Sequence, residues 1–107
     1  MSNRLFQGVI HQMKDAIDRV IGVIDENGVI ISCSELVKIG ESAQGIRDEL
    51  AYTSETVATG GYTYRPIGYG VKTEYLVFVE GEDKNAEKTS KLLSISLANI
   101  KYLYDEK

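Results

Sequence analysis

The sequence has very few of the residues on which disulfide bonding and metal binding depend. It contains one cysteine (Cys33), one histidine (His11), one proline and no tryptophan. A single cysteine cannot form an internal disulfide, which favours a reducing compartment. One histidine cannot build a metal site without further ligands, and Asp15, four residues after it, is a weak companion. We therefore expect neither a metal nor any other cofactor.

Catalytic motifs are also missing. No serine lies in a nucleophile elbow, and any serine–histidine pair would have to use His11. The glycine-containing segments 59–61 and 68–70 lack the Lys-Ser/Thr of a phosphate-binding loop and are expected to be turns. Cys33 has no cation beside it in the sequence, so a buried, unreactive thiol is expected. The chain is predicted not to be an enzyme.

Charge and hydropathy exclude two classes of partner. The net charge is −4 and the isoelectric point is about 5.0, with lysines and arginines scattered among acids, so nucleic-acid binding by this chain itself is not expected. No apolar run is long enough for a membrane span or a signal peptide. The 107 residues, 43% of them hydrophobic, fit one globular domain, 1–107. We expect a single cytoplasmic domain.

The first half of the chain is predicted to form a helix, a β-hairpin and two short helices. Apolar residues recur at helical spacing from Leu5 to Val20, with Ser2 or Asn3 as the N-cap. β-Branched residues flank Asn27-Gly28, for which we predict a type I′ turn between two strands. A short helical turn is predicted from Ser34 until Gly40 ends it, and a second short helix around Gly45–Tyr52.

The second half is predicted to supply further strands and a long helix. The segment Thr53–Gly61 is left open between a loop and a frayed edge strand. Tyr62–Ile67 alternates and predicts a strand, with Pro66 placing it at an edge or near its end. Glu74–Glu80 is almost wholly apolar, which predicts a central strand buried on both faces. Lys84–Tyr104 is predicted to be the last helix, and the fold class is α+β with an antiparallel sheet.

The last helix has apolar residues nearly all round, which predicts a second contact surface. The expected inward residues are Leu92, Leu93, Ile95, Leu97, Ala98, Ile100 and Leu103. A terminal helix that is wet on one side does not need so many, so we expect a homodimer formed through the first and last helices. A charge at Leu97 (Leu97→Glu) is predicted to break it. The chain ends inside this helix without a stop signal, which indicates the N-terminal part of a longer protein.

The hairpin and the segments after it resemble a known family of sensor domains. The matching residues are Asp25, Glu26, Gly28, Ile30 and Ile31, then Lys38-Ile39-Gly40, Gly45, Arg65-Pro66-Ile67 and Val79-Glu80-Gly81. The pattern is similar to the N-terminal domain of the carbohydrate-diacid regulator family, relatives of the purine-catabolism regulators. Two positions depart from it, because Ala43 stands where the family has histidine and Ile46 replaces its alanine.

The resemblance implies a PAS/Cache-like, ligand-sensing and dimerising domain attached to a C-terminal helix-turn-helix domain of a bacterial transcription factor. The helix, hairpin, short helices, hairpin and long helix follow the PAS-like order. A sugar diacid is the family's ligand type, but the lost histidine predicts a changed or absent small-molecule site. A small anionic ligand is expected between the sheet and the segment Ser34–Tyr52.

The candidate ligand-binding residues follow from this expectation. They are Ser34, Lys38, Gly40, Gly45, Tyr64 and Arg65. The two cations, with backbone N–H groups around the glycines, have the chemistry to hold a carboxylate or phosphate. The alternative is that both cations are solvated surface residues and that the tyrosines of the middle segment are cross-strand packing pairs.

A second function remains open at this point. The chain is also compatible with a ligand-free protein-interaction or dimerisation module of the roadblock or profilin-like type. A filled or shallow pocket together with a robust dimer would favour that module.

Overall fold

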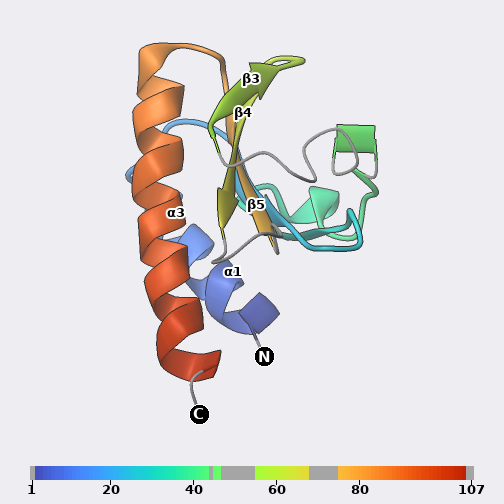
Figure 1. The fold of residues 1–107 in the computed structure, drawn as a ribbon, viewed down its shortest axis with the longest axis vertical. Coiled ribbons are helices and arrows are strands. Elements are labelled where there is room, and N and C mark those ends of the chain that lie inside the picture. Colours follow the sequence, from blue (N-terminus) through green and yellow to red (C-terminus); the bar gives the residue numbers. More distant parts are fainter. Residues whose placement is uncertain (1, 44, 47–54, 68–74, 106–107) are drawn as a thin grey trace.

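A computed structural model describes residues 2–43, 45–46, 55–67 and 75–105, with side chains described only for those among 5–99. The elements are α1 (Ser2–Met13), β1 (Ile21–Ile24), β2 (Ile30–Cys33), the 3₁₀ turn η1 (Leu36–Lys38), β3 (Val57–Thr59), β4 (Tyr62–Ile67), β5 (Tyr75–Glu80) and α3 (Lys84–Asp105). The strands form one five-stranded antiparallel sheet in the order β2-β1-β5-β4-β3 (Figure 1). The predicted α+β fold is confirmed.

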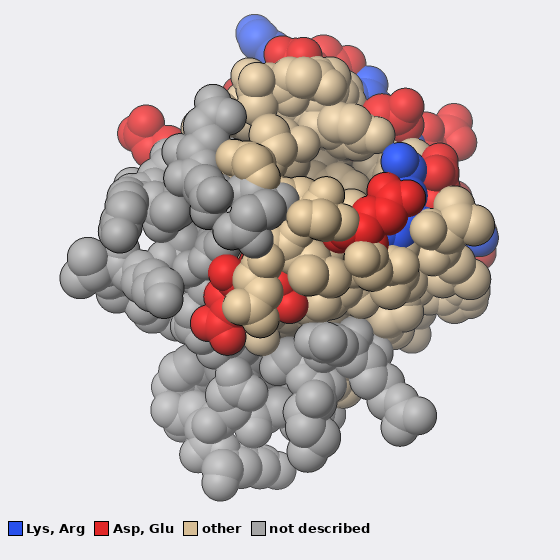
Figure 2. Space-filling model, turned by 90° about the vertical axis from the view of Figure 1, so that its right-hand side faces the viewer, with Lys and Arg blue, Asp and Glu red and all other residues tan. Residues whose placement is uncertain are grey.

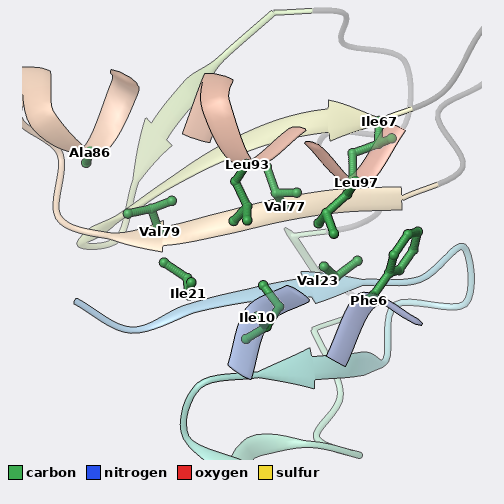
Figure 3. Close-up of a cluster of buried hydrophobic side chains, with 10 residues drawn as sticks. All are labelled: Phe6, Ile10, Ile21, Val23, Ile67, Val77, Val79, Ala86, Leu93 and Leu97. Carbon is green, nitrogen blue, oxygen red and sulfur yellow. The ribbon is translucent and has the colours of Figure 1, made fainter. Parts of the chain in front are cut away.

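The helices α1 and α3 cover the same face of the sheet (Figure 1). Phe6 and Ile10 of α1 and Leu93 and Leu97 of α3 point toward the strands and are fully or almost fully buried (Figure 3). The full cluster comprises Phe6, Ile10, Ile21, Val23, Ile67, Val77, Val79, Ala86, Leu93 and Leu97. The apolar faces of both helices are therefore used within the chain.

A second apolar cluster lies on the opposite face of the sheet. It contains Ile24, Ile30, Cys33, Tyr64, Leu76 and Phe78, with Ala43 and Ile46 packed against it. The strand β5 supplies Leu76 and Phe78 to this cluster and Val77 and Val79 to the helix-side cluster. The prediction of a central strand buried on both faces is confirmed.

The first helix is shorter than predicted. It ends at Met13, and Ile17 then donates its N–H to the Met13 carbonyl at 2.9 Å before the chain leaves the helix. Ile17 packs against the helix-side cluster, whereas Val20 packs against the cluster on the other face of the sheet. A continuous helix could not place both side chains in this way. The apolar residues after Met13 follow helical spacing because they fill two different clusters, one on each face of the sheet.

The prediction of a type I′ turn at Asn27-Gly28 is wrong. Gly28 has a φ of +80°, but Asn27 does not have the positive φ that this turn requires at both central positions. Asp25 Oδ1 instead accepts hydrogen bonds from the N–H groups of Asn27 (2.9 Å) and Val29 (3.0 Å). An aspartate that binds the backbone two residues ahead stabilises a different turn. Positive φ at both central residues occurs instead at Gly60 (61°) and Gly61 (89°), which join β3 to β4.

The segment left open between loop and edge strand contains an edge strand, β3. The strand β4 has the bounds predicted for it, and Pro66 lies near its end, opposite Leu76 of β5 and beyond the residues that pair with β3. The helix expected around Gly45–Tyr52 is described only at 45–46, which are helical. The turn expected at 68–70 lies outside the described residues.

The last helix, α3, agrees with its predicted bounds to within a residue, but two of its expected inward residues face outward. Leu92 is 66% exposed and Ile95 is 58% exposed, whereas Leu97 is fully buried. The reason is geometric, since a helix presents only one stripe to the sheet. Leu97→Glu would put a charge into the core, so it does not test a dimer; Leu92 and Ile95 are the positions that do.

Candidate functional site

A small open cavity of about 110 Å³ lies on the sheet face opposite α3. Its sheet-side wall consists of Ile24, Ile30, Tyr62, Tyr64 and Phe78. Lys38 of η1 and Ala43 line it from the segment that follows β2. Figure 2 looks onto this side of the molecule, where uncharged side chains make up most of the described surface in view.

The aromatic side chains at the cavity also pack against one another. The rings of Tyr62 and Phe78 meet edge to face with centroids 6.0 Å apart, and Tyr62 and Tyr64 lie 6.4 Å apart. Tyr64 is buried and lines the cavity. The two interpretations of the tyrosines are therefore not exclusive, because the packing pairs also form the cavity wall.

The two candidate cations lie on opposite faces of the sheet. Lys38 lines the cavity. The Nε of Arg65 donates to Ser94 Oγ of α3 at 3.1 Å, and its Nη1 donates to Thr56 Oγ1 at 2.7 Å. Successive strand residues face opposite sides, so Tyr64 and Arg65 cannot both point into one cavity. Grouping Arg65 with Tyr64 in one site was therefore incorrect.

Arg65 borders a different hollow, an open polar groove of about 400 Å³ beside α3. Glu55, Thr56, Glu87 and Lys91 line it as well. Both signs of charge are present, and Lys91 already forms an ion pair with Glu87 at 3.7 Å. The groove therefore has no clear preference for an anion or a cation.

The remaining candidate residues have structural partners or lie apart from the cavity. Ser34 Oγ accepts the N–H of Ile21 at 3.0 Å and so closes the end of the β1–β2 pair. Gly40, at φ +95°, donates its N–H to the Ile30 carbonyl at 2.7 Å. Gly45 is exposed and is not among the described residues that line the cavity. The N–H of Gly40 is therefore already bonded and is not free to bind an anion in the way predicted for the backbone around this glycine.

The outer edge of β2 is occupied by groups of the same chain. Gln7 of α1 accepts the Cys33 N–H at 3.0 Å through Oε1, and its Nε2 donates to the Cys33 carbonyl at 3.3 Å. Further along, the Ile30 N–H donates to the Glu41 carbonyl at 3.0 Å, and Gly40 bonds the Ile30 carbonyl. On β3, the opposite edge of the sheet, the described residues pair only with β4. The two edges therefore differ in their openness to a partner strand.

Cys33 is buried beside this edge. Burial raises the pKa of its thiol above the usual 9.0, because desolvation disfavours the thiolate. An unreactive thiol follows from this environment. The expectation from the sequence was the same, for a different reason.

Features of other functional classes are not found in the described part of the chain. No three side chains of the metal-binding types gather there in a way that could hold a metal ion. None of the helices described is both long and apolar enough to cross a lipid bilayer. His11 lies exposed on α1.

No protein-family model matches this chain, and no curated protein matches it. The resemblance to carbohydrate-diacid regulators therefore remains a prediction from the residues that carry it. Five cavity residues were not predicted: Ile24, Ile30, Ala43, Tyr62 and Phe78. The sequence identified the strand residues among them only as members of buried strands. Their meeting at one cavity depends on the order of the strands in the sheet, which local sequence patterns do not predict.

Proposed function

We propose that this chain is the ligand-sensing and dimerisation domain of a bacterial transcriptional regulator that acts in the cytoplasm. The observation that supports this most is the cavity between the sheet and the segment after β2. Two residues selected from the sequence for ligand binding, Lys38 and Tyr64, line it from opposite sides. Concave, mostly apolar sites with few polar groups are typical of small-molecule binding.

A physical route for the signal starts at the segment beside the cavity. Gly40 and Glu41 are hydrogen-bonded to Ile30 of β2, and the same strand is bonded at Cys33 to Gln7 of α1. The helix α1 in turn contacts α3. A ligand that displaces the segment after β2 would act on α1 through this strand edge. It can do so only if it binds the two arrangements with different affinity.

The dimer interface in this proposal is the outer face of α3. Leu92 and Ile95 lie one helical turn apart and are exposed. The most exposed positions described on α1 are Gly8, His11 and Gln12, which offer little apolar surface. We therefore assign the larger share of the homodimer contact to α3.

Thermal unfolding in the presence of small organic acids, sugar acids, purine catabolites and nucleotides tests the sensor function. A ligand at a hundred times its dissociation constant stabilises the fold by about 2.7 kcal/mol, which raises the midpoint by several degrees. A saturable shift with one chemical class, lost in a cavity variant such as Ala43→Phe, is expected. No shift with any compound would remove the support for a sensor.

The difference between the two sheet edges favours a second candidate, a protein-interaction module without a ligand. The edge of β2 is covered by Gln7 and by residues 40–43, whereas the described residues leave the outer side of β3 without a strand. An unpaired edge is a template for a partner strand. A stable dimer that forms without ligand, with Ala58→Pro on β3 abolishing it, would favour this module over the sensor.

A further inference from the structure

In the turn η1 the apolar residues are exposed to solvent, whereas the lysine lies against the protein. Leu36 is 64% exposed, Val37 is 84% exposed and Ile39, just after the turn, is 39% exposed. Lys38 is less exposed than the two apolar residues before it, and it lines the cavity. Lysine is usually among the most exposed residues, and Leu, Val and Ile among the most buried. In η1, therefore, the lysine rather than Leu36 or Val37 contributes to the cavity wall.

No carboxylate of the described residues is seen to neutralise Lys38. The ion pairs among the described residues are Arg19–Asp83 and Lys91–Glu87, and none of these four residues lines the cavity. Glu41 meets Lys38 through a backbone hydrogen bond, from the Glu41 N–H to the Lys38 carbonyl at 3.1 Å. A lysine that lines a cavity with an apolar wall offers its cation to an anionic partner.

The sheet-side wall favours a largely apolar body. Ile24, Ile30 and Phe78 present hydrocarbon surface, and Tyr62 and Tyr64 add their aromatic rings. A sugar diacid carries hydroxyl groups along its chain, and those that lie against Ile24, Ile30 or Phe78 would be left without hydrogen bonds, at a cost of about 1–3 kcal/mol each. The volume of about 110 Å³ is somewhat smaller than a cavity of about 150 Å³ that holds benzene. Because the cavity is open on one side, a compact apolar group can lie in it while a polar group stays at the opening.

We propose that the cavity binds a small monocarboxylate with a compact apolar body, a branched-chain or single-ring acid. The apolar body lies on Ile24, Ile30 and Phe78, and the carboxylate lies at the open side against the Lys38 ammonium. This proposal rests on the proposed sensor function and names the ligand class of the same site. It differs from the sugar diacid that the resemblance implies.

Methyl NMR of the full chain, labelled at isoleucine δ-methyl groups, tests the proposal with benzoate and 3-methylbutanoate as probes. We expect saturable shifts of the Ile24 and Ile30 methyls for at least one acid. The Ile10 and Ile21 methyls, on the helix side of the sheet, are the internal reference. The matching amides, benzamide and 3-methylbutanamide, have the same shape without the charge, and we expect them to bind about tenfold more weakly, equivalent to about 1.4 kcal/mol.

Two lysine variants separate the role of Lys38 from general attraction to a cation. Lys38→Met keeps the length and apolar character of the side chain, and we expect it to weaken the binding of the acids about tenfold while leaving the amides unchanged. Lys88→Met removes an exposed lysine of α3 and should leave both classes unchanged. Equal binding of acid and amide, or equal loss in both variants, would overturn the proposal.

The sugar diacid D-glucarate distinguishes failure of this proposal from failure of the sensor function. If D-glucarate or another polar compound shifts the Ile24 and Ile30 methyls and the apolar acids do not, the ligand class is wrong and the sensor stands. If no compound shifts these methyls, both proposals fall.

Discussion

Gly22 of β1 is expected to be the least replaceable glycine of the described sheet. A Cβ at this position would lie 2.5 Å from the Ser32 carbonyl oxygen and 2.7 Å from Cε1 of Phe78, and still closer to Cζ of the same ring. Real side chains do not approach this closely. The Phe78 ring lies across β1 because Gly22, its partner in the β1–β5 register, has no side chain.

The expected cost of Gly22→Ala follows from these contacts. Overpacking a core costs about 1–3 kcal/mol, and the contact with the Ser32 oxygen belongs to the backbone of the neighbouring strand, so side-chain rotation cannot relieve it. The lower chain entropy of alanine offsets about 0.5–1 kcal/mol. A net loss of about 1–2 kcal/mol would lower the unfolding midpoint by about 4–16 °C in a domain of this size.

Urea unfolding followed by circular dichroism, with heat unfolding in parallel, measures this loss. Gly8→Ala is the matched control, since a Cβ at Gly8 of α1 meets no atom within 4 Å. It should stabilise the helix by up to about 1 kcal/mol. The two identical substitutions are thus expected to have opposite signs.

A double substitution identifies the source of the strain. In a Phe78→Leu background the ring contact is gone, so Gly22→Ala should cost less than it does in the parent chain. A Gly22→Ala variant as stable as the parent would refute the close approach of β1, β2 and the Phe78 ring. A cost unchanged by Phe78→Leu would instead assign the strain to the Ser32 carbonyl alone.

Three other perturbations have definite expected outcomes. The hydrogen bond from Arg19 and that from the Ala86 N–H lower the pKa of Asp83 from 3.8 to about 2, so its stabilising effect is complete above pH 3.8 and is lost as the pH falls toward 2. The difference in midpoint between the parent and Asp83→Asn should therefore shrink between pH 5 and pH 2, and a constant difference would contradict this assignment. Gln7→Ala removes both partners of the Cys33 backbone, which should cost about 1–2 kcal/mol and speed amide exchange at Cys33; unchanged exchange would show that water replaces the amide. Leu92→Glu with Ile95→Glu should weaken the homodimer proposed above, as measured by sedimentation, at unchanged stability, because both side chains are exposed; a dimer unaltered by these changes would place the interface elsewhere.

Elements with strong local signals were predictable from the sequence. The apolar run of β5 and the alternation of aromatic and polar residues in β4 gave nearly correct bounds, because each pattern lies within its own strand. The start of α3 was marked by Asp83, which accepts the Ala86 N–H at 3.0 Å as an N-cap. These signals are local, so no tertiary contact was needed to read them.

Competing local interactions caused the errors. Asn27-Gly28 carries the strongest hairpin signal in the chain, yet the carboxylate of Asp25 binds two backbone N–H groups and stabilises another turn. The apolar spacing that extended the first helix to Val20 came from residues that fill cores on both faces of the sheet. In the first case a competing side-chain interaction overrode the turn signal. In the second case the apolar spacing came from burial on two faces of the sheet and not from one helix.

The cavity depends on strand order, which local patterns do not contain. Ile24 and Tyr64 meet there because β1 and β4 both pair with β5, at Leu76 and Phe78 respectively, although they are far apart in the sequence. Lys38 joins them only because η1 exposes Leu36 and Val37. An amphipathic rule applied to η1 would bury those two residues and expose the lysine. The cavity therefore lies where the local rule fails, and a sequence is expected to break local rules where function constrains it, which agrees with the proposed ligand site.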